Sequence, residues 1–199
     1  MSVADTSSPV RERIMAAAFD LFYRQGYRAT GVNQVIAASG VAKASFYDHF
    51  PAKHDLLHAY ISEAARREID DIRAGIATLT SPRDRFLGLL RLLPGWLEES
   101  DYRGCPFQNI AAEVPLEDER VREVVRRHHE NLRELLREQA RELLDDEPGL
   151  ALRLDAGELA DTCLVLAEGA IVLAVAYRDP WPVHAAVASL ERCLTEAGG

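Results

Sequence analysis

Residues 30–53 read TGVNQVIAASGVAKASFYDHFPAK, and this stretch decides the fold. Apolar residues recur with helical spacing on both sides of Gly40, and Val41 follows the glycine as a plug for the junction. Glycine adopts positive φ angles without steric cost, so Gly40 allows a sharp turn between two short helices. The second helix, roughly residues 42–49, is expected to bury Phe46 and to keep its polar residues on the other side. This arrangement is typical of a helix-turn-helix, whose second helix enters the major groove of DNA.

The segment before this stretch supplies one more helix. Pro9 suits the first turn of a helix and Gly26 suits a C-terminal stop, so a helix is predicted between them. Thr30 is predicted to be the N-cap of the next helix or a phosphate ligand. Residues 1–8 are expected to form a disordered polar tail. The helix-turn-helix DNA-binding domain is therefore expected over residues 9–53.

Helical periodicity continues through residues 54–199, and no strand pattern stands out. We predict an all-α fold of about nine helices, in which a three-helix DNA-binding domain precedes a larger helical domain. One helix in this second domain is expected to kink or end at Pro94-Gly95. Beyond the helix-turn-helix, helices are expected near residues 53–77, 82–93, 106–113, 116–146, 155–177 and 183–195.

The charge of the chain is unevenly distributed. The formal net charge is -9, yet residues 1–60 carry six Lys and Arg against five Asp and Glu, a balance of +1. Both lysines of the protein, Lys43 and Lys53, lie in this segment. So small a positive charge predicts DNA binding through a few well-placed contacts, because a broad basic surface is missing from the sequence.

Cysteine content and hydropathy narrow the class of protein further. The three cysteines, Cys105, Cys163 and Cys193, are widely spaced and follow no CxxC pattern, which argues against a disulfide framework or a structural zinc site. The longest nearly apolar stretch, residues 164–177, is interrupted by Glu168 and is shorter than the roughly 20 residues that span a bilayer. We therefore expect a soluble cytoplasmic protein without a membrane segment, cofactor or metal.

The predicted helix over residues 155–177 is apolar on nearly all sides and must be covered on all of them. Pairing of the last two helices across a two-fold axis would build a four-helix bundle between two subunits. Such a homodimer matches the symmetry of a palindromic DNA operator. Burial of the same helix inside a monomer is the alternative.

The first 60 residues resemble the DNA-binding domain of the TetR (tetracycline-repressor-like) family of bacterial regulators. The resemblance implies that residues 54–199 form a helical effector-binding and dimerisation domain, in which a bound small molecule changes the separation of the two DNA-reading helices of a dimer. The residues that carry the resemblance are Thr30, Ser39-Gly40-Val41, Tyr47-Asp48-His49-Phe50 and Lys53. Gly104-Cys105-Pro106-Phe107, Asn109 and Glu113 further resemble a recurring segment of some members.

The predicted recognition helix carries side chains suited to DNA. Lys43 can donate to guanine O6 and N7 or to phosphate, Ala44 can meet a thymine methyl group, and Ser45 can reach either base or backbone. Tyr47 and His49 are expected to donate to the DNA backbone. The predicted DNA contacts are Thr30, Lys43, Ala44, Ser45, Tyr47, His49 and Lys53.

An effector pocket is expected to be mostly apolar with a few convergent polar groups. Glu168 is notable because a carboxylate on an apolar helix needs a partner or a ligand. Trp96, Phe107 and His128 are equally compatible with an ordinary core role. The predicted effector-binding residues are Trp96, Cys105, Phe107, Asn109, His128 and Glu168.

The leading hypothesis is a homodimeric transcriptional repressor that a small, largely apolar effector releases from a palindromic operator. Cys105 precedes a predicted helix, where the helix dipole lowers a thiol pKa, so a redox or electrophile sensor of the same architecture is an alternative to a plain buried cysteine. An all-α enzyme with Cys105 as nucleophile and His128 or His129 as base lacks a third catalytic group, and we do not expect an enzyme. A helix-turn-helix protein that senses nothing remains a further alternative.

Overall fold

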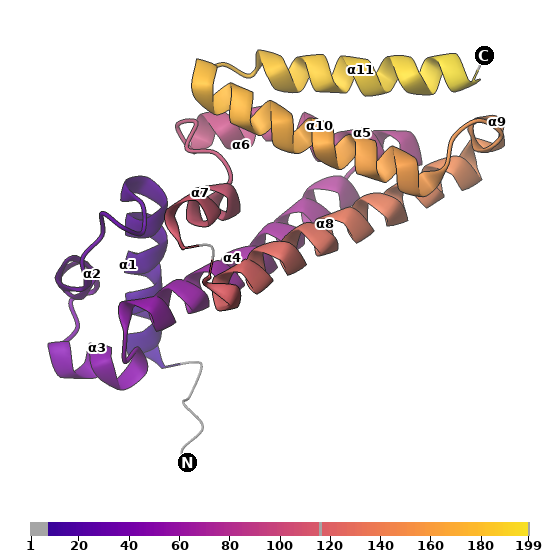
Figure 1. Ribbon diagram of the computed structural model, residues 1–199. Helices are drawn as coiled ribbons and strands as arrows, with labels where there is room; N and C mark the ends of the chain where they lie inside the picture. The colour runs from indigo at the N-terminus through magenta and orange to yellow at the C-terminus, as the bar shows by residue number, and fades with distance from the viewer. Residues whose placement is uncertain (1–7, 116, 199) are drawn as a thin grey trace. The chain divides into compact units, whose positions relative to one another are not determined.

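The computed structural model describes residues 8–115 and 117–198, and these residues form helices and connecting loops without strands (Figure 1). The prediction of an all-α protein with an N-terminal helix-turn-helix is confirmed. The predicted disordered tail lies, apart from Ser8, outside the described residues. Within the described ranges the helices are α1 (Pro9–Gln25), α2 (Val32–Ser39), α3 (Lys43–His49), α4 (Lys53–Ala77), α5 (Pro82–Arg91), α6 (Leu93–Glu99), α7 (Pro106–Glu113), α8 (Glu119–Asp146), α9 (Pro148–Ala151), α10 (Ala156–Tyr177) and α11 (Trp181–Gly198).

The chain folds into two compact units. The first, called here the reader unit, runs to Arg66 and also includes Pro106–Val125; the second, the helical unit, contains Arg67–Cys105 and the chain from Arg126 onward. Two helices, α4 and α8, contribute residues to both units. The reader unit is therefore larger than the motif over residues 9–53, because it takes in the start of α4, all of α7 and the start of α8.

The core of the reader unit forms where α1 packs against α2 and α3. Ile14, Ala18 and Phe22 recur at helical spacing on α1 and are buried, as the apolar pattern predicts. Tyr60 of α4 closes this core, and its ring meets that of Phe22 edge to face with centroids 5.5 Å apart. Phe46 of α3 is completely buried in the same core. Because removing this large apolar side chain from water is favourable, its burial holds α3 in place.

The helical unit is built around contacts of α11 with α5 and α10. Leu90 of α5 and Leu190 of α11 are buried in this core. Local signals in the sequence start the helices: Ser81 caps α5 by accepting from the Asp84 N–H at 3.0 Å, and Asp155 caps α10 by accepting from the Gly157 N–H at 2.8 Å.

Two predicted helix limits need correction. The helix break expected at Pro94-Gly95 lies at Leu92, and Pro94 falls in the first turn of α6, where a missing N–H costs little. The last helix begins at Trp181, two residues before the predicted start at Val183, because the carboxylate of Asp179 accepts from the Trp181 N–H at 2.9 Å.

The long helix expected from residue 116 is α8, which begins at Glu119. Its expected first residue lies outside the described residues. The predicted helix over residues 106–113 is present as α7 with the same limits. Proline at the first position of α7 fixes φ near the helical value and needs no hydrogen-bond partner for its nitrogen.

Candidate DNA-binding site

The turn between α2 and α3 depends on one glycine. Gly40 has φ 63° and ψ 27°, the left-handed conformation, and its N–H donates to the Ile36 carbonyl at 3.1 Å. A side chain at this position would meet no other atom within 4 Å, so backbone conformation alone requires the glycine. Val41 follows with 8% exposure and fills the junction, as predicted.

The recognition helix α3 has a buried face and a free face. Phe46 is fully buried, and Phe50, just past the end of the helix, is 4% exposed. The opposite face consists of polar and small residues that point to solvent or are half-buried. Among the predicted DNA contacts, Lys43, Ala44 and Tyr47 are exposed, and Ser45 and His49 are half-buried. The side of α3 that the sequence predicts to be polar is therefore the side that the helix does not bury in the core.

The prediction that Thr30 caps α2 is wrong. The N-cap is Gly31, whose N–H donates to the Oε1 of Gln34 at 2.6 Å. Thr30 is fully buried, and its hydroxyl donates to the Gly26 carbonyl at 2.8 Å. Its hydroxyl therefore ties the loop to the end of α1 and is not presented to a phosphate.

Lys53 is the first residue of α4, as predicted. Its ammonium lies 4.1 Å from the ring centroid of Tyr27, a cation–π contact. Partial burial lowers the pKa of Lys53, and the carboxylate of Glu113 opposes that effect. The N-terminus of α4 already has an anion, because the carboxylate of Asp55 accepts from the Ala52 N–H at 3.1 Å.

Two acidic side chains connect the segment 106–118 to the loop after α1 and to the start of α4 within the reader unit. Glu113, the last residue of α7, accepts a hydrogen bond from the Arg28 N–H at 2.7 Å. Asp118 lies 2.8 Å from the Nε2 of His54 in α4. The loop after α1 passes close to Glu113, because a Cβ atom added to Gly26 would lie 2.7 Å from its Oε1. These contacts were not predicted, since Glu113 was noted only as part of the family resemblance.

The predicted effector residues are distributed over both units. Phe107, which is fully buried, and Asn109, which is half-buried, belong to the reader unit. Trp96, half-buried, and Cys105, 4% exposed, belong to the helical unit. Burial of Cys105 leaves the thiol-sensor alternative without support, and these four residues do not line the internal cavity described next.

A cavity of about 60 Å³ lies inside the helical unit between residues of α4, α5, α8 and α10. Glu168 lines it, and its Oε1 is 3.6 Å from the Nε2 of His129. Glu68 of α4 also lines it, and its Oε2 is 3.7 Å from the Nε2 of His128. Of the predicted effector residues, Glu168 lines this cavity, and His128 lies beside it against Glu68. Sequence reasoning missed Glu68, because it lies in a run of charged residues that looks like a solvated helix face.

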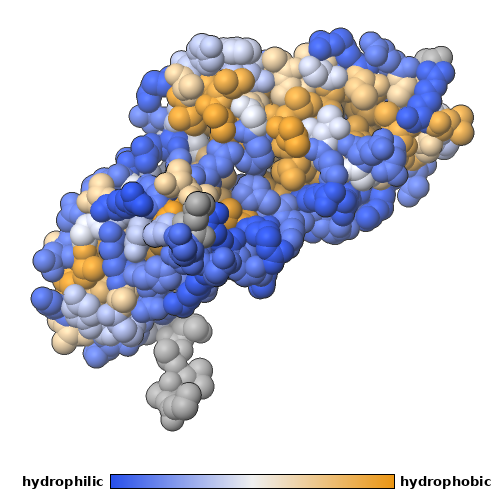
Figure 2. All heavy atoms as spheres, viewed as in Figure 1, coloured by the Kyte–Doolittle hydropathy of each residue, from blue (hydrophilic) through white to orange (hydrophobic). Residues whose placement is uncertain are grey.

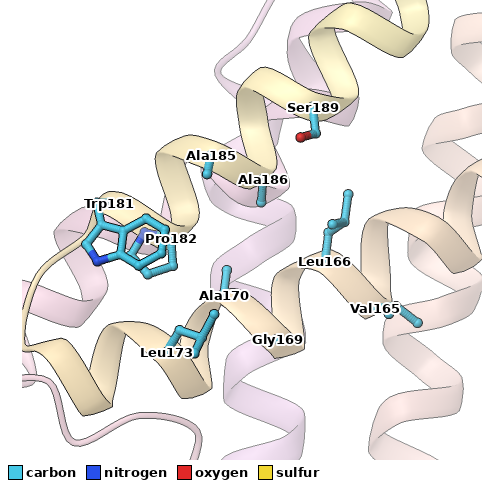
Figure 3. Close-up of a pocket in the computed structure, with 10 residues that line it drawn as sticks. All are labelled: Val165, Leu166, Gly169, Ala170, Leu173, Trp181, Pro182, Ala185, Ala186 and Ser189. Carbon is cyan, nitrogen blue, oxygen red and sulfur yellow. The ribbon is translucent and has the colours of Figure 1, made fainter.

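A separate apolar groove runs along the surface between α10 and α11, with a volume of about 270 Å³ (Figure 3). Val165, Leu173 and Trp181 line it and are 72%, 44% and 46% exposed. Figure 2 shows apolar side chains gathered on this part of the molecule. By length and hydropathy the 22-residue helix α10 would suffice to cross a membrane, but a single helix of this kind is weak evidence for a membrane segment. Core helices of soluble proteins meet the same criterion.

Comparison with known proteins agrees with this geometry. The family model for bacterial regulatory proteins of the tetR family matches residues 14–60, and the model for a tetracyclin repressor-like C-terminal domain matches residues 82–190. The chain is 30% identical over 178 residues to the HTH-type transcriptional regulator LmrA of Bacillus subtilis, covering 87% of this chain and 90% of the relative.

Solved structures show the same fold. A TetR-family transcriptional regulator from Streptomyces coelicolor superposes with a TM-score of 0.82 at 23% identity, covering 96% of this chain and 91% of that one. A TetR transcriptional regulator from Chloroflexus aurantiacus superposes with a TM-score of 0.78 at 29% identity, covering 94% of each chain. The chain therefore belongs to the TetR family, and it is a DNA-binding transcriptional regulator with a helix-turn-helix reader.

Proposed function

We propose that the protein is a homodimeric repressor that a small, largely apolar effector releases from a palindromic operator. The observation that carries the proposal is the free face of α3, which is anchored by buried Phe46 and leaves Lys43 and Tyr47 exposed. A helix held rigidly from one side with polar residues on the other has the geometry that major-groove recognition requires.

The proposed contacts divide between bases and backbone. Lys43 reads guanine or binds phosphate, Ala44 meets a thymine methyl group and Ser45 contacts either base or backbone. Tyr47 and His49 donate to phosphate. Lys53 can also bind a phosphate, provided that its ammonium moves away from the face of the Tyr27 ring. Thr30 is left out of the proposed contact set because it is buried.

The proposed dimer forms through α10 and α11. Its support is the exposed apolar groove between these helices, where Val165 and Leu173 face solvent. Burying such a groove against its copy is favourable by about 25 cal/mol for each Å² of apolar surface removed from water. A two-fold axis there presents two copies of α3, so the operator should hold two half-sites about 34 Å apart or a multiple of that distance.

Regulation needs an effector with different affinities for two conformations of the protein. The contacts of Glu113 with the Arg28 N–H and of Asp118 with His54 connect α7 and the residue before α8 to the loop after α1 and to the start of α4, and we propose this route for transmitting a change to the DNA-reading helices. We propose a cytoplasmic location because the target is DNA. Relatives named as transcriptional regulators favour this role over catalysis.

Selection of binding sites from randomised duplex DNA tests the proposal. The full chain should enrich a palindromic sequence, bind it as two protomers and release it when an effector is added. Failure to enrich any sequence at moderate salt would overturn the proposed function. A repressor should lower, and not raise, expression from a promoter that contains the selected site.

A further inference from the structure

The cavity inside the helical unit combines an apolar wall with two carboxylates. Glu68 comes from α4 and Glu168 from α10, and both line the same space of about 60 Å³. The rest of the wall is aliphatic and includes Leu90, Leu132 and Ile171. We call this space the carboxylate cavity. An apolar space with acidic groups on facing helices is chemically matched to a ligand that is both apolar and positively charged.

The charges around the cavity favour an added cation. Burial, followed by the repulsion from Glu168, raises the pKa of Glu68 to about 7. His129 opposes this effect on the pKa of Glu68, and the negative charge of Asp71 adds to it. Burial lowers the pKa of His128 to about 4, so this histidine is neutral at pH 7. The Nε2 of His129 lies 3.6 Å from the Oε1 of Glu168. A cationic ligand in the cavity would be a second basic group beside this carboxylate.

We propose that the carboxylate cavity binds a small organic cation, a primary alkylammonium, held between Glu68 and Glu168 with its alkyl part against the leucine and isoleucine side chains. This inference rests on the proposed function, since it names the chemical class of the effector. A hydrated metal ion fits the wall less well, because aliphatic side chains cannot replace the water that the ion would keep.

Cavity volume limits the size of the ligand. A cavity that just holds one water measures about 10 to 15 Å³ in the same way, so 60 Å³ accommodates a ligand of about four or five non-hydrogen atoms, such as an ammonium group with a short chain. A longer chain must push aliphatic side chains aside, and Glu68 belongs to α4, the helix that begins at Lys53 in the reader unit. Ligand binding at Glu68 therefore acts on a helix that the DNA reader shares.

Calorimetric titration of the full chain with n-butylammonium at pH 7.5 tests the proposal, with n-butanol as the neutral probe of similar size. Wild type should bind the amine at least tenfold more tightly than the alcohol. Glu168→Gln should weaken amine binding at least tenfold and leave the alcohol unaffected. Glu158→Gln, at an exposed position in the first turn of the same helix, should behave like wild type.

A second variant, Glu68→Gln, keeps the test informative if Glu168→Gln unfolds. Because amine binding should need both carboxylates, this variant should also weaken it. Equal affinity of wild type and both variants for the amine, or equal affinity for amine and alcohol, would overturn the inference. Operator binding measured on the same samples separates the two claims. A wild type that binds operator but not the amine refutes the inference alone, whereas a wild type that binds no DNA refutes the proposed function.

Discussion

Replacing Glu68 by Gln is expected to stabilise the protein at pH 8 and to have little effect at pH 5. Burial and the repulsion from Glu168 raise the pKa of Glu68 from 4.5 to about 7, so the folded state holds the proton more tightly than the unfolded state. Stability is then lost as pH rises from about 4.5 to about 7, and the full cost remains above that range. Glutamine is neutral at every pH and avoids the cost.

The size of the effect follows from the pKa shift and the exposure of the side chain. A shift from 4.5 to about 7 sets a ceiling of about 3.5 kcal/mol at about 1.4 kcal/mol for each pH unit. The Glu68 side chain is 32% exposed, so water screens part of the interaction. We therefore expect Glu68→Gln to raise the free energy of unfolding at pH 8 by about 1 to 2 kcal/mol.

Urea unfolding at pH 5 and pH 8, at one protein concentration, measures this difference. Comparing the variant with wild type at each pH largely cancels the titration of His128, which is common to both chains. Glu158→Gln, which alters an exposed carboxylate of α10, is the control and should show no such pH dependence. A loss of stability in Glu68→Gln that is equal at the two pH values would refute the reasoning, because the carboxylate would then act as a hydrogen-bonding group and not as a buried charge.

Three further predictions concern the reader and the groove. Gly40→Ala should lower the free energy of unfolding by about 1 kcal/mol, because the left-handed backbone conformation is strained for alanine while the added methyl group meets no other atom. Chemical denaturation measures the loss, and a much larger one would show that packing at this position matters as well. Tyr47→Ala should weaken operator binding, measured by fluorescence anisotropy, about tenfold or more. The melting temperature should change by no more than a few degrees, because Tyr47 is 42% exposed. An unchanged affinity would remove Tyr47 from the site. Val165→Arg should turn a dimer into a monomer, because Val165 lines the groove on α10 and is 72% exposed, and an unchanged sedimentation coefficient would exclude this groove from the interface.

The reader was predictable from sequence because its signals are local. Spacing of apolar residues placed Phe46 and Phe50 in the core, and Gly40 marked the turn. Thr30 was misassigned because a threonine before a helix can either cap it or turn inward. The choice depends on how close the end of α1 comes, and the Gly26 carbonyl at 2.8 Å decides it.

The carboxylate cavity could not be predicted in the same way. Its two acidic residues, Glu68 and Glu168, are separated by 100 positions, and only the folding of the helical unit brings them to one space. Glu168 was visible in the sequence as a charge on an apolar helix. Glu68 was hidden, because acidic and basic neighbours in α4 gave it the pattern of a solvated surface.

The central claim is that two copies of α3, joined through α10 and α11, read one palindromic DNA site. Its most direct test is analytical ultracentrifugation of the protein with the duplex enriched by binding-site selection, combined with footprinting of that duplex. The account predicts two protomers on one duplex and two protected half-sites whose centres lie about 34 Å apart, or a multiple of that distance. One protomer bound to a single, asymmetric site would contradict it.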